Sequence, residues 1–391
     1  MDDMHKSLLI GLSSRILVVA VFVLSSVLFS VSSQQPASHL TNQLPVVNLF
    51  YRFDSGYCIS IARTGYVTMA DWNFFPLFSV ITRAVSSIGA VSIFFNPFSV
   101  PYSMELTNAV EFAGFLVSNV AFLISIYFFY KLTYKIFKPM QIALVATAFY
   151  CFWGGAVFYS AIYGEALFIA LALGAFYYLE EGKLRNAVML GFLASFTRSN
   201  GFLICIPFLI CALQVIKNKP KTIKLLASSA LVGSPFLIFQ LIGYIVAGRF
   251  PITLIAHNSW PIYHSLPTQL ALVYNSSLGL FSFYVVGLAL IFLPAVYFIC
   301  RLRAMSIKNN SIKEDKQLKY WAFYASTIFV ILIDQSNLFS VIRYAVPLLP
   351  IYWVSAIIYC KDRSIGIAIF VVMTGMLIIG SYFLETGGPF M

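Results

Sequence analysis

The segment Tyr51–Pro76, YRFDSGYCISIARTGYVTMADWNFFP, gathers arginine, aspartate, glycine and aromatic side chains in a chain that is otherwise strongly apolar. Its first carboxylate, Asp54, could accept a proton from an acceptor hydroxyl and so serve as a general base. Alternatively, Asp54 could cap the N-terminus of a helix by accepting hydrogen bonds from free backbone N–H groups. The spacing of the residues alone favours the capping role for Asp54, and the residues around it favour the role of general base.

A short helix is expected to begin at or near Asp54. The residues that share one helical face with it are Tyr57, Cys58, Ile61, Ala62 and Gly65. Glycine suits the position just after a helix because it tolerates a left-handed backbone. We therefore predict a surface helix that ends at Gly65.

The whole composition predicts a membrane protein. Of 391 residues, 60% are hydrophobic and only 10% are charged, and the mean hydropathy is +0.87. Repeated apolar runs of about 20 residues indicate transmembrane helices, and the strand alternation of a barrel is absent. We predict an all-α polytopic protein with one integral membrane domain over 1–391. About eleven spans are expected, at 8–31, 106–130, 141–162, 164–180, 186–198, 201–216, 223–247, 279–300, 320–338, 344–360 and 364–384.

The segments between the first two spans form the first luminal or exterior loop, 32–105, which carries the candidate site. Within it, residues 76–98 are moderately apolar but contain Arg83, so we expect them to be interfacial or re-entrant. The six cysteines show no CxxC or Cys/His spacing, which indicates neither a disulfide framework nor a zinc site.

The basic residues predict the topology. With the N-terminus in the cytoplasm, 19 of the 25 basic residues, Arg15 among them, fall on the cytoplasmic side. All lysines lie there, so the net charge of +11 indicates topology and not nucleic-acid binding. The six basic residues on the far side are all arginines: Arg52, Arg63, Arg83, Arg198, Arg249 and Arg343.

Arginine can bind a phosphate through two parallel hydrogen bonds. As a set, the far-side arginines therefore favour a phosphate or acidic lipid headgroup on that face. For any single arginine, snorkelling or ion pairing with Asp54, Asp71 or Glu165 is the simpler interpretation.

Five patches with distinctive residues occur in one order: RFDSGYCISIARTGY at 52–66, DWNFFP at 71–76, SAIYGEALF at 160–168, FTRSNG at 196–201 and RYAVPLLPIYW at 343–353. In this order they resemble the PIG-V family, the GPI mannosyltransferase 2 type of integral membrane glycosyltransferase. Three positions depart from the family pattern, because Phe53 replaces a Trp, Leu77 a Gly and Gly164 a Ser.

The resemblance implies a GT-C fold whose active site faces the lumen or exterior. It implies dolichyl-phosphate mannose as donor and a lipid-linked glycan as acceptor, as in addition of the second mannose in GPI-anchor biosynthesis at the endoplasmic reticulum membrane. The absence of a Gly-rich phosphate loop and of a DxD pair agrees with a donor that is not a nucleotide sugar. A small membrane subunit is a further candidate partner, and no metal or cofactor is expected.

Each candidate site residue receives an expected role. Asp54 would be the base of an inverting displacement, and Arg198 and Arg343 would bind the donor phosphate. The remaining substrate-binding candidates are Arg52, Trp72, Asn73, Glu165 and Asn200.

Several interpretations stay open. Glu165 is equally well explained by a functional role and by a favourable position at a helix N-terminus. Asp334 could pair with Arg343, and His257 and His264 are expected to be incidental. The alternatives for the whole chain are a prokaryotic polyprenyl-phosphate-sugar transferase in a plasma membrane, a transporter, and a non-catalytic subunit. A transporter is disfavoured because no repeat of broken spans is visible.

Overall fold

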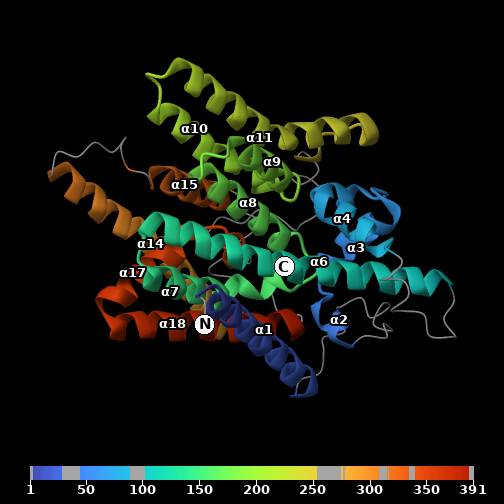
Figure 1. Ribbon diagram of the computed structural model, residues 1–391. Coiled ribbons are helices and arrows are strands. Elements are labelled where there is room, and N and C mark those ends of the chain that lie inside the picture. Colours follow the sequence, from blue (N-terminus) through green and yellow to red (C-terminus); the bar gives the residue numbers. More distant parts are fainter. Residues whose placement is uncertain are drawn as a thin grey trace.

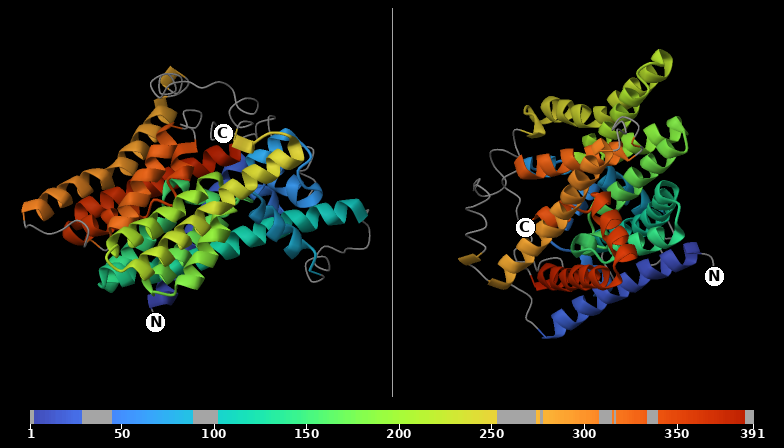
Figure 2. Two further views of the ribbon diagram at one scale, coloured as in Figure 1. Left: turned by 90° about the horizontal axis from the view of Figure 1, so that it is seen from above. Right: turned by 90° about the vertical axis from the view of Figure 1, so that its left-hand side faces the viewer.

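The computed structural model describes residues 3–28, 45–88, 102–252, 274–275, 278–307, 315, 317–333 and 340–386. Every regular element in these ranges is helical, which confirms the predicted all-α class. Most of the helices run side by side in a bundle (Figures 1 and 2). The positions Asp334, His257 and His264 lie outside the described residues.

Five helices in these ranges are long and apolar enough to cross a membrane. They are α1 (Asp3–Leu28), α6 (Tyr102–Phe137), α11 (Lys219–Ala247), α14 (Leu278–Ile307) and α18 (Arg363–Thr386). Each coincides with a predicted span.

The other six predicted spans coincide with shorter helices. These are α7 (Met140–Cys151), α8 (Glu165–Glu180), α9 (Leu184–Ser195), α10 (Cys205–Gln214), α15 (Leu318–Ile333) and α17 (Leu349–Lys361). The predicted span 141–162 is too long, because α7 ends at Cys151 and the buried 3₁₀ helix η3 (Gly154–Tyr159) follows. Irregular backbone at this depth is tolerated because protein surrounds it. Helix α8 lies between α6 and α9, and most of its side chains are buried.

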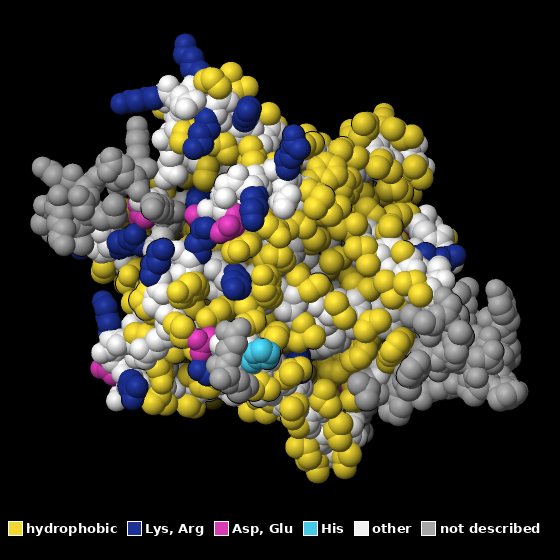
Figure 3. All heavy atoms as spheres, viewed as in Figure 1, with side chains coloured by type: hydrophobic (Ala, Val, Ile, Leu, Met, Phe, Trp, Pro, Cys, Tyr) yellow, Lys and Arg dark blue, Asp and Glu magenta, His cyan; other side chains and the backbone are white. Residues whose placement is uncertain are grey.

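The two ends of the bundle differ in charge. Helix α8 begins at Glu165 and ends beside Lys183, α9 runs back toward Arg198, and α17 follows Arg343 and ends at Lys361. The lysines therefore gather at one end of these helices, and the predicted site residues lie at the opposite end. We call this the outer end, because the lysine distribution predicts that it faces away from the cytoplasm. Figure 3 shows Lys and Arg side chains gathered toward the left of the molecule and a broad hydrophobic surface beside them.

Arg15 does not belong to the charged end. It lies in the middle of α1, where its Nη1 atom donates to the Ala156 carbonyl at 2.7 Å and its guanidinium covers the Phe122 ring at 4.5 Å. Its assignment as a cytoplasmic topology charge is wrong. The side chain instead links α1 to η3, as buried charges in membrane helices usually find protein partners.

The first outer loop folds as short helices on the side of α6. They are α2 (Pro45–Phe50), α3 (Ser55–Thr64), the 3₁₀ helix η2 (Met69–Asn73) and α4 (Pro76–Ser86). The predicted helix from Asp54 to Gly65 is confirmed as α3. Gly65 has a φ of 77° and donates its N–H to the Ile61 carbonyl. The second half of the predicted interfacial segment 76–98 lies outside the described residues.

Candidate active site

Four charged side chains from distant parts of the sequence form one hydrogen-bonded network at the outer end of the bundle. Arg343 Nη1 donates to Asp54 Oδ2 at 2.6 Å. Arg343 Nε also donates to Glu165 Oε1, and Arg198 Nη1 pairs with the same oxygen. Glu165 thus lies between two guanidinium groups, and the four formal charges sum to zero. We call Asp54, Glu165, Arg198 and Arg343 the charge network.

The charge network is mostly buried, but part of it is exposed to solvent. The Glu165 side chain is 3% exposed, whereas the Asp54 and Arg198 side chains are each 14% exposed. Ion pairs in such surroundings are stronger than those on an open surface because water screens them less. The exposed edge of Asp54 and Arg198 leaves an approach for a substrate.

Asp54 occupies the N-cap position of α3, but its side chain makes no capping hydrogen bond. The carboxylate instead points toward Arg343. Phe53, immediately before it, has a φ of 40°, a left-handed backbone that is strained for a bulky residue. Strain of this kind persists only where the surroundings hold it, and here it turns the chain so that Asp54 faces the network.

Glu165 is the first residue of α8, with Gly164 at the N-cap. Both interpretations of this residue therefore apply, because the helix N-terminus favours its negative charge and two arginines bind it. Its second oxygen, Oε2, is buried and has no hydrogen-bond partner among the described residues.

Aromatic rings cover both guanidinium groups. The Arg343 guanidinium lies 4.5 Å from the Tyr163 ring centroid and 5.3 Å from that of Phe158. The Arg198 guanidinium lies 5.3 Å from the Tyr344 ring. Such stacking holds the planar groups in orientation and excludes water from one face. Neither Tyr163, two residues before Glu165, nor Tyr344, directly after Arg343, was among the predicted site residues.

Hydrogen bonds also join the patches that contain these residues. The Ile162 N–H donates to the Phe50 carbonyl at 3.2 Å, and the Tyr163 hydroxyl donates to the Arg52 carbonyl at 2.9 Å. The Leu77 N–H, next to the DWNFFP patch, donates to the Phe196 carbonyl at 3.1 Å. All five sequence patches thus meet at this end of the bundle.

Arg52 lies next to the network but does not join it. Its Nη2 atom pairs with Glu385 at 2.5 Å, and this side chain is only 4% exposed. Its Nη1 atom donates to the Asn48 and Tyr51 carbonyls. The arginine that was expected to bind substrate therefore ties the first outer loop to the end of α18.

Trp72 packs in a separate aromatic cluster. Its ring stacks on Tyr66 with centroids 4.4 Å apart and lies 5.7 Å from Phe239. The indole is buried, so the structure gives it a packing role, and its contact with a sugar stays a prediction.

Asn73 and Asn200 each present an unused acceptor. The side-chain Oδ1 atom of each residue is buried and has no hydrogen-bond partner within the described ranges. Buried polar atoms without partners are rare in folded proteins and often mark sites that water or a ligand completes. Both residues therefore remain candidates for hydroxyl contacts.

Three other far-side charged residues, Arg63, Arg83 and Asp71, have structural partners. Arg63 pairs with Glu111 at 2.8 Å, and Arg83 donates to the Ala62 and Arg63 carbonyls at the end of α3. Asp71 accepts hydrogen bonds from the backbone N–H groups of Val67 and Thr68 and does not pair with an arginine. Of the six far-side arginines, only Arg198 and Arg343 lie in the charge network.

A protein-bound metal was not expected. Over the ranges that the structure describes, no group of three His, Cys, Asp or Glu side chains is arranged to hold a metal ion. The expectation of metal-independent chemistry stays a prediction, because metal removal is the experiment that tests it.

The solved structures to which this chain is similar include oligosaccharyltransferases of Archaeoglobus fulgidus. The apo form aligns with a TM-score of 0.48 and 11% identity, over 97% of this chain and 55% of that chain. The complex with zinc and sulfate aligns with a TM-score of 0.47 and 12% identity, over 96% and 53%. AglB from the same organism, bound to an inhibitory peptide and dolichol-phosphate, aligns with a TM-score of 0.46 and 11% identity, over 96% and 55%. The chain thus spans about half the length of these structures.

No curated protein sequence matches the chain. A family model described as "Mannosyltransferase (PIG-V)" matches residues 23–249, more than half of the 391 residues. This range contains Asp54, Glu165 and Arg198, and Arg343 joins them through the fold. The chain therefore belongs to the PIG-V mannosyltransferase family.

Proposed function

We propose that this protein transfers mannose from dolichyl-phosphate mannose to a lipid-linked glycan, as in addition of the second mannose during GPI-anchor biosynthesis. The observation that carries the proposal is the charge network, in which one carboxylate, Asp54, shares Arg343 with a buried glutamate. The reaction needs a proton acceptor and a binding site for a phosphate leaving group, and the network holds residues suited to both tasks.

The donor phosphate would bind the two arginines. Because the network is electrically balanced, an incoming phosphate must compete with Asp54 and Glu165 for the guanidinium donors. Arg343 carries five N–H donors, and the pair with Asp54 uses its Nη1 atom while the pair with Glu165 uses Nε. Phosphate binding would therefore weaken the ion pair between Arg343 and Asp54 and free the carboxylate to accept a proton.

The chemistry would be a direct displacement with inversion at the anomeric carbon. Asp54 takes the proton of the acceptor hydroxyl as its oxygen attacks, and the bond from the sugar to the phosphate breaks. Negative charge then grows on the departing dolichyl phosphate, where the fixed arginines stabilise it. The aromatic rings beside Arg198 and Arg343 exclude water and so strengthen this effect.

The acceptor glycan would lie against the outer loop. Asn73 and Asn200 each offer a buried acceptor oxygen that a sugar hydroxyl can complete. The polyprenyl tail of the donor would lie between helices of the GT-C architecture that the family resemblance implies. In a eukaryotic cell, the membrane would be that of the endoplasmic reticulum.

The test is a transfer assay with purified protein in detergent. Radiolabelled dolichyl-phosphate mannose is offered with a GPI precursor that carries one mannose, with other lipid-linked glycans, and with each acceptor omitted. GDP-mannose serves as the nucleotide-sugar control. Transfer from the dolichyl donor to the GPI precursor supports the proposal. Transfer to a different glycan would support the donor assignment and contradict the acceptor assignment. Transfer from GDP-mannose alone would overturn the donor assignment.

A further inference from the structure

A groove lies between α9 and α11, with a volume of about 790 Å³. Its walls include the apolar side chains of Val188, Phe192 and Leu231. Beneath it the two helices approach closely, since a Cβ added at Gly191 would lie 3.1 Å from the Val232 side chain. This size falls within the usual range for sites that bind a small organic ligand.

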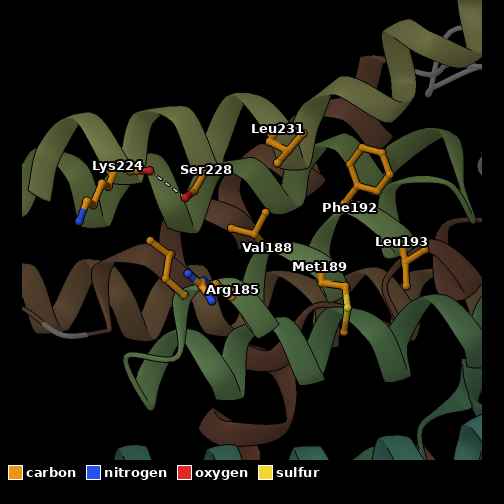
Figure 4. A pocket seen from close by; sticks show the side chains of 9 residues that line it. Arg185, Val188, Met189, Phe192, Leu193, Lys224, Ser228 and Leu231 are labelled. Atoms are coloured by element: carbon orange, nitrogen blue, oxygen red, sulfur yellow. Dashed lines mark hydrogen bonds between the residues drawn. The ribbon is translucent and has the colours of Figure 1, made fainter.

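The groove has one charged end and one apolar end. Figure 4 shows Lys224 and Arg185 toward one end, and Phe192 and Leu193 toward the other. Arg185 and Lys224 are both exposed. The Ser228 hydroxyl donates to the Lys224 backbone carbonyl at 2.7 Å and leaves the lysine ammonium group uninvolved.

Several basic residues at this end of the bundle have carboxylate partners. Lys319 pairs with Glu180 at 2.7 Å, and Arg301 pairs with Asp315 at 3.0 Å. Arg185 and Lys224 form no ion pair with any carboxylate in the described part of the chain. Two unneutralised cations at the mouth of an apolar groove complement a ligand that has an anionic head and a hydrocarbon chain.

We propose that this groove binds an anionic phospholipid of the leaflet on the lysine-rich side. Its phosphate would lie between Arg185 and Lys224, and one acyl chain would lie along Val188, Phe192 and Leu231. Basic pockets between membrane helices on the cytoplasmic side bind anionic lipid headgroups.

The site differs from the one proposed for the donor. Arg185 lies at the start of α9, whereas Arg198 follows the end of that helix. The 12 residues of α9 separate the two positions by roughly 18 Å along its axis. A lipid whose phosphate binds Arg198 and Arg343 therefore has its head at the opposite end of the bundle from this groove.

The experiment uses the delipidated full chain in detergent, with phosphatidylglycerol or phosphatidylcholine of the same acyl chains added. Bound lipid is counted by native mass spectrometry, and the melting temperature is recorded. Phosphatidylglycerol is expected to remain bound and to raise the Tm by a few degrees, because it binds only the folded state. Equal retention of phosphatidylcholine would overturn the proposal.

Two variants and a control distinguish lipid binding in the groove from nonspecific attraction to positive charge. Arg185→Gln with Lys224→Gln should weaken phosphatidylglycerol binding about tenfold or more. Leu231→Trp, at a half-exposed position, keeps both charges and should weaken binding by filling the groove. The control, Lys217→Gln with Lys221→Gln, removes the same charge from exposed positions outside the groove and should leave binding unchanged. An equal loss in the control, or displacement of the lipid by dolichyl phosphate, would contradict the assignment.

Discussion

Asp54 and Arg343, which are 289 residues apart in the sequence, meet in a hydrogen-bonded ion pair of 2.6 Å at the outer end of the helix bundle. This pair joins the first outer loop to the segment before α17, and Glu165 extends it to Arg198. The candidate base and both candidate phosphate ligands therefore share one site, whereas Arg52 and Trp72 lie outside it.

The arginines should not tolerate lysine. Arg343 donates from two nitrogen atoms to two carboxylates, which a single ammonium cannot do in the same plane. Loss of one charge-assisted hydrogen bond is expected to lower transfer about tenfold to a hundredfold in Arg343→Lys and in Arg198→Lys. Steady-state kinetics with the dolichyl donor measures the effect. Full activity in Arg198→Lys would return that residue to a structural role.

The two aspartates of the opening segment should behave differently. Asp71 accepts hydrogen bonds from the Val67 and Thr68 N–H groups and is not part of the charge network. Asp71→Asn is expected to lower stability by about 1 kcal/mol through a weaker helix start, with kcat of the folded enzyme unchanged. A melting curve combined with kinetics on the surviving fraction distinguishes the two effects. A selective loss of kcat would place Asp71 in the reaction.

The pair between Arg52 and Glu385 should be structural. Arg52→Met alone removes one half of the buried ion pair with Glu385 and is expected to cost about 3 kcal/mol. Arg52→Met combined with Glu385→Leu removes both charges and should recover much of that stability. Transfer activity of the double variant is the decisive readout. If stability returns while activity stays lost, Arg52 binds substrate as the sequence first indicated.

Chelation should leave transfer intact. The proposed leaving-group stabilisation comes from Arg198 and Arg343, which are fixed by Glu165. Activity is therefore expected to be the same after dialysis against EDTA as before, when measured with the same donor and acceptor. Loss of activity in EDTA that a divalent metal restores would contradict this expectation.

Local features of the sequence predicted local structure well. Helix α3 follows from apolar residues at helical spacing and from Gly65, whose left-handed backbone ends the helix. The helices also followed from apolar runs, although α7 ended early. Its continuation into η3 depends on burial against other elements, which no local pattern encodes.

The pairing of charges depended on the tertiary fold. Spacing favoured a capping role for the Asp54 side chain, but Arg343 approaches from a distant segment and takes the carboxylate. The sequence did not distinguish Arg52 from Arg343. In the fold, Arg52 pairs with Glu385 at the end of α18. Glu385 could have been noticed, because an acidic residue at the end of an apolar helix usually has a partner.

The proposed transfer reaction depends most directly on Asp54 as the base within the charge network. The measurement is single-turnover transfer by Asp54→Asn in detergent, with dolichyl-phosphate mannose binding and thermal stability recorded on the same preparation. We predict that the variant is expressed in the membrane and binds the donor, while transfer falls by about a hundredfold or more. Near-normal turnover in Asp54→Asn would show that Asp54 is not the base.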